Sequence, residues 1–87
     1  MKAFVYILKD EKGRFYIGST NDLERRMIQH KIGHTQTTRN MNNPSLVLSQ
    51  EYETLQIARI VEKKIKKLKR KDYIEKMIFD GYIKIKP

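Results

Sequence analysis

Cysteine and tryptophan are absent from this 87-residue chain, and proline and glycine occur only two and four times. Without cysteine there can be neither a disulfide framework nor a thiolate zinc site, so side-chain packing must stabilise the fold. The opening apolar run ends at Leu8, which is too short for a signal-peptide core or a membrane span. We therefore expect one small cytoplasmic domain covering residues 1–87 and no membrane partner.

Acidic residues are also scarce, with ten Asp and Glu against nineteen Lys and Arg, which gives a formal net charge of +9. This excess favours a polyanionic partner, because contacts with phosphates release counterions. An acidic membrane is the weaker alternative, since the basic helix expected after Thr54 has only a narrow apolar stripe. The charge therefore indicates nucleic acid, with DNA expected and RNA as the alternative.

Two strand-like segments open the chain. Residues 3–8 are all apolar or aromatic, which predicts a strand covered on both faces and central in a sheet. Residues 15–18 resume the strand pattern after a polar connection that contains Gly13, so the two segments are expected to form a hairpin. This hairpin brings Tyr6 and Tyr16 close together, although Tyr6 could equally be a core tyrosine with a local hydrogen-bond partner.

A helix is expected directly after this hairpin. Asn21 is a good N-cap, and Glu24 three residues later completes a capping box. Arg26 and His30 then lie one turn apart on the same helix face. Taken from spacing alone, this pair is most simply a solvated surface pair.

The segments on either side of this helix are polar. The small residues 18–20 precede its positive end, where backbone amides favour an anion such as phosphate. Gly33 is the expected end of the helix, and a polar loop with Thr38 and Arg39 follows it. These side chains suit sugar-phosphate contacts, although most polar loops are simply connections.

The second half of the chain predicts one strand and two helices. Residues 45–52 alternate loosely and read as a third strand. Thr54 is the expected cap of a helix with a buried stripe, and Asp72 with Glu75 is expected to cap a final helix that ends near Gly81. The tail, residues 82–87, alternates and is expected either to add an edge strand or to stay mobile. The buried positions expected in the two helices are Ala58, Val61, Ile65, Leu68, Ile74, Met77 and Ile78.

Glu62 is a lone acid in a strongly basic segment. Between Arg59 and Lys71 eight bases surround it. The default interpretation is an i, i+4 pair with Lys66, worth a few tenths of a kcal/mol on an exposed helix, and the bases are by default a solvated face.

The ordered pattern resembles the GIY-YIG nuclease superfamily, and most closely its small single-domain members. The resemblance rests on Phe4-Val5-Tyr6, Tyr16-Ile17-Gly18, the Leu23-x-x-Arg26-x-x-x-His30 helix and the later helical Glu62. Phe4 stands in place of the first glycine, Ser19 in place of a lysine of the repair-incision relatives, and no asparagine follows the glutamate. The resemblance implies a compact α/β fold, a three-stranded antiparallel sheet flanked by three helices in the order β-β-α-β-α-α.

The resemblance also implies a reaction, because GIY-YIG enzymes hydrolyse phosphodiester bonds with one divalent metal ion. It assigns Tyr6 and Tyr16 to positioning and deprotonating water, Arg26 to the phosphate charge, His30 to hydrogen bonding or proton relay, and Glu62 to one Mg²⁺ or Mn²⁺ ion. Tyrosine is ordinarily a poor base at neutral pH. We expect nearby cations to favour its phenolate, and the choice between the two tyrosines stays open.

These observations predict a metal-dependent DNA endonuclease that acts on branched, nicked or single-stranded DNA in repair or recombination. A protein partner that supplies target specificity is possible, and the oligomeric state is open. Two alternatives are a catalytically inactive nucleic-acid-binding module and an interaction protein that docks on RNA or an acidic partner. The expected nucleic-acid contacts are Gly18, Ser19, Thr20, Arg25, Thr38, Arg39, Arg59, Lys63 and Lys66.

Overall fold

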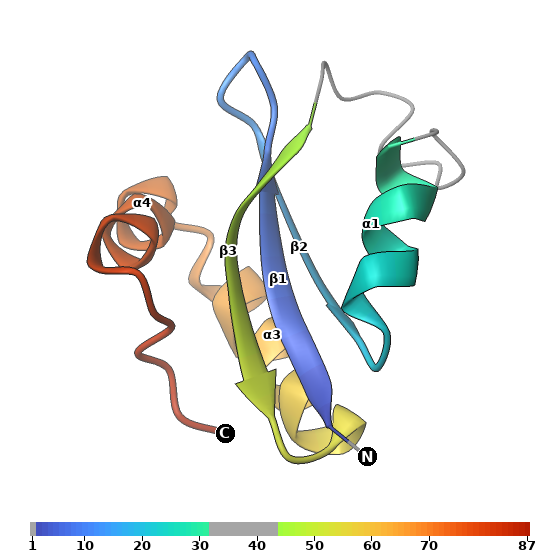
Figure 1. The fold of residues 1–87 in the computed structure, drawn as a ribbon. Helices are drawn as coiled ribbons and strands as arrows, with labels where there is room; N and C mark the ends of the chain where they lie inside the picture. Colours follow the sequence, from blue (N-terminus) through green and yellow to red (C-terminus); the bar gives the residue numbers. More distant parts are fainter. Residues whose placement is uncertain (1, 32–43) are drawn as a thin grey trace.

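The computed structural model describes residues 2–31 and 44–87, which form an α/β arrangement of three layers (Figure 1). Helix α1 covers one face of the sheet, and α3 and α4 cover the other (Figure 1). The predicted element order is confirmed across the described residues, whereas the expectations for Gly33, Thr38 and Arg39 lie outside them. The elements are β1 (Ala3–Lys9), β2 (Phe15–Thr20), α1 (Leu23–Lys31), β3 (Ser45–Tyr52), α3 (Leu55–Leu68) and α4 (Lys71–Asp80).

The sheet has the order β2-β1-β3, and both pairings are antiparallel. This confirms β1 as the central strand and leaves β2 as an edge strand. Tyr6 of β1 lies opposite Gly18 of β2 and Ser49 of β3, and the pairing with β3 shifts between Ile7 and Leu8. The register therefore fixes which β2 residue lies beside the Tyr6 ring.

The hydrophobic core lies between the sheet and the α3–α4 layer. Ala3, Val5 and Ile7 of β1 join it from the sheet, and a buried Val or Ile contributes about 1.5–3 kcal/mol to folding. The alternate β1 residues face α1, so this strand is buried on both faces, as its unbroken apolar sequence predicts. The helices contribute Ala58, Val61, Ile65, Ile74 and Met77, while Leu68 is only half-buried.

Asp10 organises the turn between β1 and β2. The residue is 5% exposed, and one carboxylate oxygen accepts hydrogen bonds from the amides of Lys12 (3.0 Å) and Arg14 (2.8 Å). The other oxygen accepts from Arg14 Nε at 2.7 Å. Gly13 completes the turn with a φ of 79°, a conformation that glycine adopts without steric cost. The hairpin register is thus set by a buried acid.

Helix α1 begins one residue later than Asn21 and Glu24 predict, so the expected capping box is wrong. Asp22 is the N-cap, and its Oδ1 accepts a hydrogen bond from the Arg25 amide at 3.1 Å. With the helix starting at Leu23, the third helical position is Arg25, and Glu24 stands one place too early for the reciprocal bond. The Asp22 carboxylate is also a stronger acceptor for a helix amide than the neutral side-chain amide of Asn21.

Of the caps predicted for α3 and α4, two are confirmed and one is wrong. Thr54 caps α3 as predicted, because its hydroxyl accepts from the Ile57 amide at 3.1 Å. Asp72 is not the cap of α4: Arg70 holds that position, and Asp72 lies in the first turn paired with it at 2.9 Å. Gly81 ends α4 as predicted, with a φ of 82°.

The C-terminal residues 82–87, all of them described, form no strand, so the edge-strand alternative is wrong. Ile83 is 4% exposed and packs into the core. Its amide donates to Gln50 Oε1 at 2.7 Å, and its carbonyl accepts from Gln50 Nε2 at 3.2 Å. A side chain of β3 therefore anchors the tail in place of strand pairing.

Within residues 2–31 and 44–87, no helix combines the length and the apolar character needed to cross a membrane.

Candidate active site

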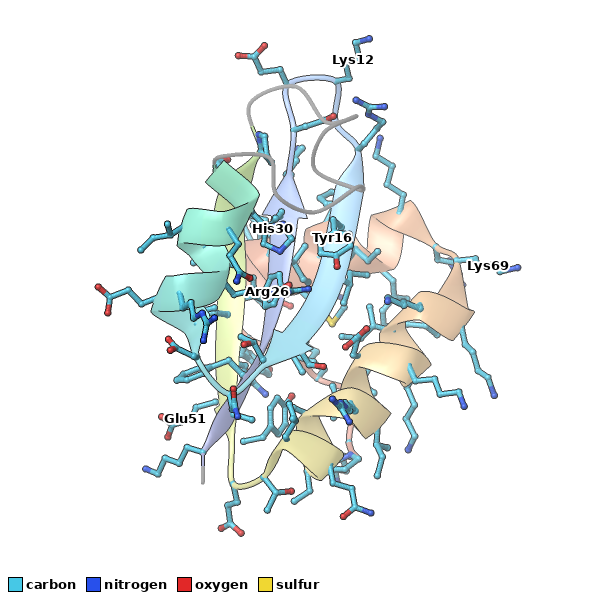
Figure 2. The ribbon with its side chains drawn as sticks, turned by 90° about the vertical axis from the view of Figure 1, so that its right-hand side faces the viewer. Lys12, Tyr16, Arg26, His30, Glu51 and Lys69 are labelled. Carbon is cyan, nitrogen blue, oxygen red and sulfur yellow. The ribbon has the colours of Figure 1, made fainter. Side chains whose placement is uncertain are left out.

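The predicted site residues gather along β2, the edge strand of the sheet. Figure 2 looks onto this edge, with α1 on one side and the α3–α4 layer on the other. Tyr16, Arg26 and His30 lie beside one another between β2 and α1 (Figure 2). Side chains from β2 and α1 thus lie in one region.

Tyr6 is the centre of this group and is fully buried. Its hydroxyl lies 2.9 Å from His30 Nε2 and accepts a hydrogen bond from Arg26 Nε at 3.3 Å. The Tyr6 ring centroid is 6.2 Å from that of Tyr16 and 5.5 Å from that of His30, and the Tyr16 and His30 centroids are 5.2 Å apart. Two strands and one helix therefore hold four of the five predicted catalytic side chains in mutual contact.

The surroundings of His30 favour its neutral form. His30 Nε2 shares a hydrogen bond with the Tyr6 hydroxyl, whose oxygen also accepts from Arg26 Nε. Burial lowers the pKa of His30, and the positive charge of Arg26 lowers it further. His30 is therefore a neutral imidazole at pH 7.

Tyr6 remains a phenol, contrary to the expectation that surrounding cations favour its phenolate. Burial raises the pKa of Tyr6 to about 12 and outweighs the hydrogen bond from Arg26, which lowers it. The same hydrogen bond is the main reason that the pKa of Arg26 is raised. Tyr6 is thus suited to orienting Arg26 and His30, and Arg26 stays charged.

Gly18 provides the room that the Tyr6 ring needs. A Cβ atom at this position would overlap the hydroxyl and ring carbons of Tyr6. The glycine of the Tyr16-Ile17-Gly18 triplet therefore has a packing function in the described structure. A contact between Gly18 and nucleic acid stays a prediction.

Glu62 approaches the same edge strand from the α3 layer. Ser19 Oγ donates a hydrogen bond to Glu62 Oε1, and Lys66 Nζ lies 2.7 Å from Oε2. Because side chains alternate along a strand, Ser19 faces α3 while its neighbour Gly18 faces Tyr6. The predicted carboxylate is therefore on the opposite face of β2 from the Tyr6 group, separated from it by one strand.

The donors around Glu62 suit a hard divalent ion. A carboxylate and a hydroxyl are oxygen ligands of the kind that Mg²⁺ and Mn²⁺ take, and Mg²⁺ commonly binds through one or two carboxylates, waters and substrate phosphate. In the part of the chain that the structure describes, no three His, Cys, Asp or Glu side chains form a cage for an ion. Glu62 therefore fits an ion that is held mainly by water and substrate.

A polar hollow of about 180 Å³ adjoins Arg26 at the start of α1. Arg26 Nη1 donates to Gln29 Oε1 at 3.2 Å, which orients the guanidinium next to this hollow. Sequence reasoning passed over Gln29, although its i, i+3 spacing from Arg26 was the available signal. The lining contains two of the predicted nucleic-acid contacts and consists of Thr20, Asn21, Asp22, Arg25, Arg26 and Gln29.

A larger hollow, of about 680 Å³, lies against α1 and contains none of the predicted catalytic residues. Its lining is mainly apolar, with Phe4, Leu23, Met27, Ile28 and Leu46 among it. Apolar walls suit phosphate poorly, so chemistry and not size identifies the candidate site.

The remaining predicted contacts are on α3. Arg59, Lys63 and Lys66 are exposed and follow one another at spacings of four and three residues, which places them along one helix face. This face carries Lys66 next to Glu62, so cations extend along the helix from the carboxylate. Their contact with phosphates stays a prediction.

Comparison with known proteins places the chain in a family. It is similar to the solution NMR structure of the UPF0213 protein BH0048 from Bacillus halodurans, with 29% identity, a TM-score of 0.59, and coverage of 93% of this chain and 87% of that one. Comparison with curated proteins gives no match. The family model described as the GIY-YIG catalytic domain matches residues 2–77, so the chain belongs to the GIY-YIG nuclease family.

Proposed function

We propose that this protein is a metal-dependent endonuclease that hydrolyses phosphodiester bonds in DNA. The observation that best supports the proposal is the Tyr6 network, in which one buried hydroxyl is hydrogen-bonded to both Arg26 and His30. Such a network holds a cation and an imidazole in fixed positions beside the edge strand β2. Preorganised groups of this kind are what phosphate chemistry requires.

Arg26 would stabilise the charge of the scissile phosphate. The polar hollow beside it has room for a phosphate group, and Arg25 adds a second cation to its lining. A guanidinium forms paired hydrogen bonds to phosphate oxygens, and its hydrogen bonds to Tyr6 and Gln29 reduce its freedom before substrate arrives. Little reorganisation is then needed in the transition state.

Tyr16 is the better candidate for the group that accepts a proton from the attacking water. Tyr6 is fully buried with a pKa of about 12, whereas Tyr16 is half-buried on the edge strand. Tyr6 and His30 would then hold Tyr16 and Arg26 in position through ring contacts and hydrogen bonds. Proton transfer through a positioned side chain typically accelerates a reaction by about 10²- to 10⁴-fold. Tyr16 would need to contribute an acceleration in this range.

Glu62, with the Ser19 hydroxyl, would hold one Mg²⁺ or Mn²⁺ ion. When bound, the ion supplies Lewis-acid stabilisation of phosphate oxygens. Within the chain itself, Ser19 orients the carboxylate through its hydrogen bond to Oε1. The exposed cations of α3 would hold the nucleic-acid backbone alongside.

Backbone contacts of this kind carry no sequence information, which supports selection by DNA structure. We propose branched, nicked or single-stranded DNA as substrate, a role in repair or recombination, and action as one cytoplasmic domain over residues 1–87. A protein partner could add target specificity.

The test is cleavage of plasmid and of branched, nicked and single-stranded oligonucleotides in Mg²⁺ or Mn²⁺. Arg26→Ala, Tyr16→Phe and Glu62→Gln should each lower the rate by about 10²-fold or more while circular dichroism shows a retained fold. Lys12→Ala is the matched control, because it removes a cation at the hairpin tip, at a distance from Arg26 (Figure 2). Wild-type rates in any of the three variants would remove that residue from the mechanism.

The contacts of Ser19 and Lys66 with the Glu62 carboxylate favour one alternative, a catalytically inactive nucleic-acid-binding module. Both carboxylate oxygens already have protein partners, which a permanently inactive protein would tolerate. This alternative predicts salt-sensitive binding of DNA or RNA without cleavage at high protein concentration. Preference for RNA in direct competition would instead indicate an RNA-docking protein.

A further inference from the structure

The Glu62 carboxylate has a different protein donor on each oxygen. Ser19 donates to Oε1 from β2, and the Lys66 ammonium lies 2.7 Å from Oε2 one helical turn away. An ammonium at this distance occupies the space that a metal ion needs in order to bind Oε2. Lys66 therefore stands where it competes directly with a divalent cation.

The ion pair between Lys66 and Glu62 can break at a small cost in free energy. The Lys66 side chain is 52% exposed, whereas that of Glu62 is 19% exposed. Ion pairs at i, i+4 on exposed helices contribute only a few tenths of a kcal/mol, and Lys has a flexible four-carbon stem. The carboxylate stays against β2 while the ammonium is free to swing to a nearby anion.

Nucleic acid would provide that anion. Lys66 continues the exposed cationic face that begins with Arg59 and Lys63, so a backbone lying along α3 passes next to its ammonium. Moving Lys66 to a phosphate would uncover Oε2 and bring a phosphate oxygen close to it. One carboxylate oxygen and phosphate oxygens together form a better cation site than Glu62 alone.

We propose that Lys66 is a gate on the metal site: its ammonium occupies Glu62 Oε2 until a substrate phosphate attracts the ammonium away and leaves Oε2 free for the metal ion. The inference rests on the proposed function and adds an order of binding to it, nucleic acid before metal. It also assigns to Lys66 a positioning task that an ordinary phosphate contact such as Lys63 does not have. The gate would limit metal-dependent cleavage to the bound complex.

The test measures Mn²⁺ binding to the full chain without nucleic acid, from the loss of the free-ion EPR signal. Lys66→Met keeps most of the side-chain length and removes the charge, and it should tighten Mn²⁺ binding by about fivefold or more. Lys67→Met, the matched control, removes the same charge from the adjacent residue and should change the affinity by less than about twofold because solvent screens it. Glu62→Gln in the Lys66→Met background should abolish the gain, which locates the ion.

The second arm adds an uncleavable phosphorothioate oligonucleotide. In the wild type it should tighten Mn²⁺ binding, and in Lys66→Met the added tightening should be smaller because the gate is already absent. Equal affinities for Lys66→Met and Lys67→Met, or no measurable Mn²⁺ binding by Lys66→Met at millimolar concentration, would overturn the gate. Loss of cleavage in Glu62→Gln with unchanged Mn²⁺ binding in Lys66→Met would sink the gate and leave the nuclease proposal standing.

Discussion

The two faces of β2 hold their polar groups in different ways. On the α1 face, Tyr6 is fully buried and its hydroxyl ties together Arg26 and His30. On the α3 face, Glu62 is held by a serine hydroxyl and by a half-exposed lysine. Buried hydrogen bonds fix a geometry, whereas exposed ion pairs rearrange easily. In the proposed mechanism, the rigid α1 face would bind phosphate and the adjustable α3 face would hold the metal ion.

The largest expected effect separates the two tyrosines of the rigid face. Tyr16→Phe should lower the cleavage rate by about 10²- to 10⁴-fold if Tyr16 accepts the proton. Tyr6→Phe should cost less in rate, about tenfold, because it disturbs the positions of Arg26 and His30 without removing the base. The reverse order, measured on one oligonucleotide under single-turnover conditions, would transfer the role of base to Tyr6.

A second effect tests how tightly the rigid face is packed. Gly18→Val places side-chain atoms in the space of the Tyr6 phenol and should lower the free energy of unfolding by about 2–3 kcal/mol. Thr20→Val, two residues along on the same face of β2, should cost less than about 1 kcal/mol. Urea denaturation measures both, and equal costs would mean that the Tyr6 ring can move aside.

The pH dependence of stability provides a third test. The pKa of His30 is lowered in the folded protein, so below about pH 6.5 the unfolded chain binds a proton that the folded protein does not. The free energy of unfolding should therefore fall as the pH falls below that value. His30→Gln should flatten this part of the profile, and an unchanged slope would show that His30 is not held neutral.

Tyr6 gives the corresponding effect at high pH. Its folded pKa of about 12 lies above the usual value of 10, so the unfolded chain loses its proton first. Stability should therefore decline between about pH 10 and 12, and Tyr6→Phe should remove that contribution.

The smallest expected effect concerns the adjustable face. Lys66→Met should change the free energy of unfolding by less than about 0.5 kcal/mol, because an i, i+4 pair with a half-exposed lysine contributes little. A loss above 1.5 kcal/mol would mean that the pair is structural, and the contrast between the two faces would disappear.

Local patterns in the sequence were sufficient for most of the fold. The unbroken apolar run of residues 3–8 predicts a strand buried on both faces, and Thr54 and Gly81 mark helix ends where the structure has them. The errors at Asn21 and Asp72 arise because several capping residues stand close together. A shift of one or two residues then depends on tertiary packing.

The sequence indicated which side chains gather around Tyr6 but not their electrostatics, and their catalytic roles stay a prediction. The spacing of Arg26 and His30 puts them on one helix face, and the family pattern adds Tyr6, Tyr16 and Glu62. The pKa of Tyr6 depends on burial by α1 and β2, which sequence alone does not supply. The Ser19–Glu62 hydrogen bond joins residues 43 positions apart, so no local pattern could indicate it.

The most direct test of the account is a double-variant comparison across β2. Arg26→Ala and Glu62→Gln are measured singly and together for cleavage of one oligonucleotide. If both faces act on the same phosphate, each single variant loses about 10²- to 10³-fold and the double variant is no slower than the slower single one. Full activity of Glu62→Gln beside an inactive Arg26→Ala would contradict the account, because the α3 face would then have no part in the reaction.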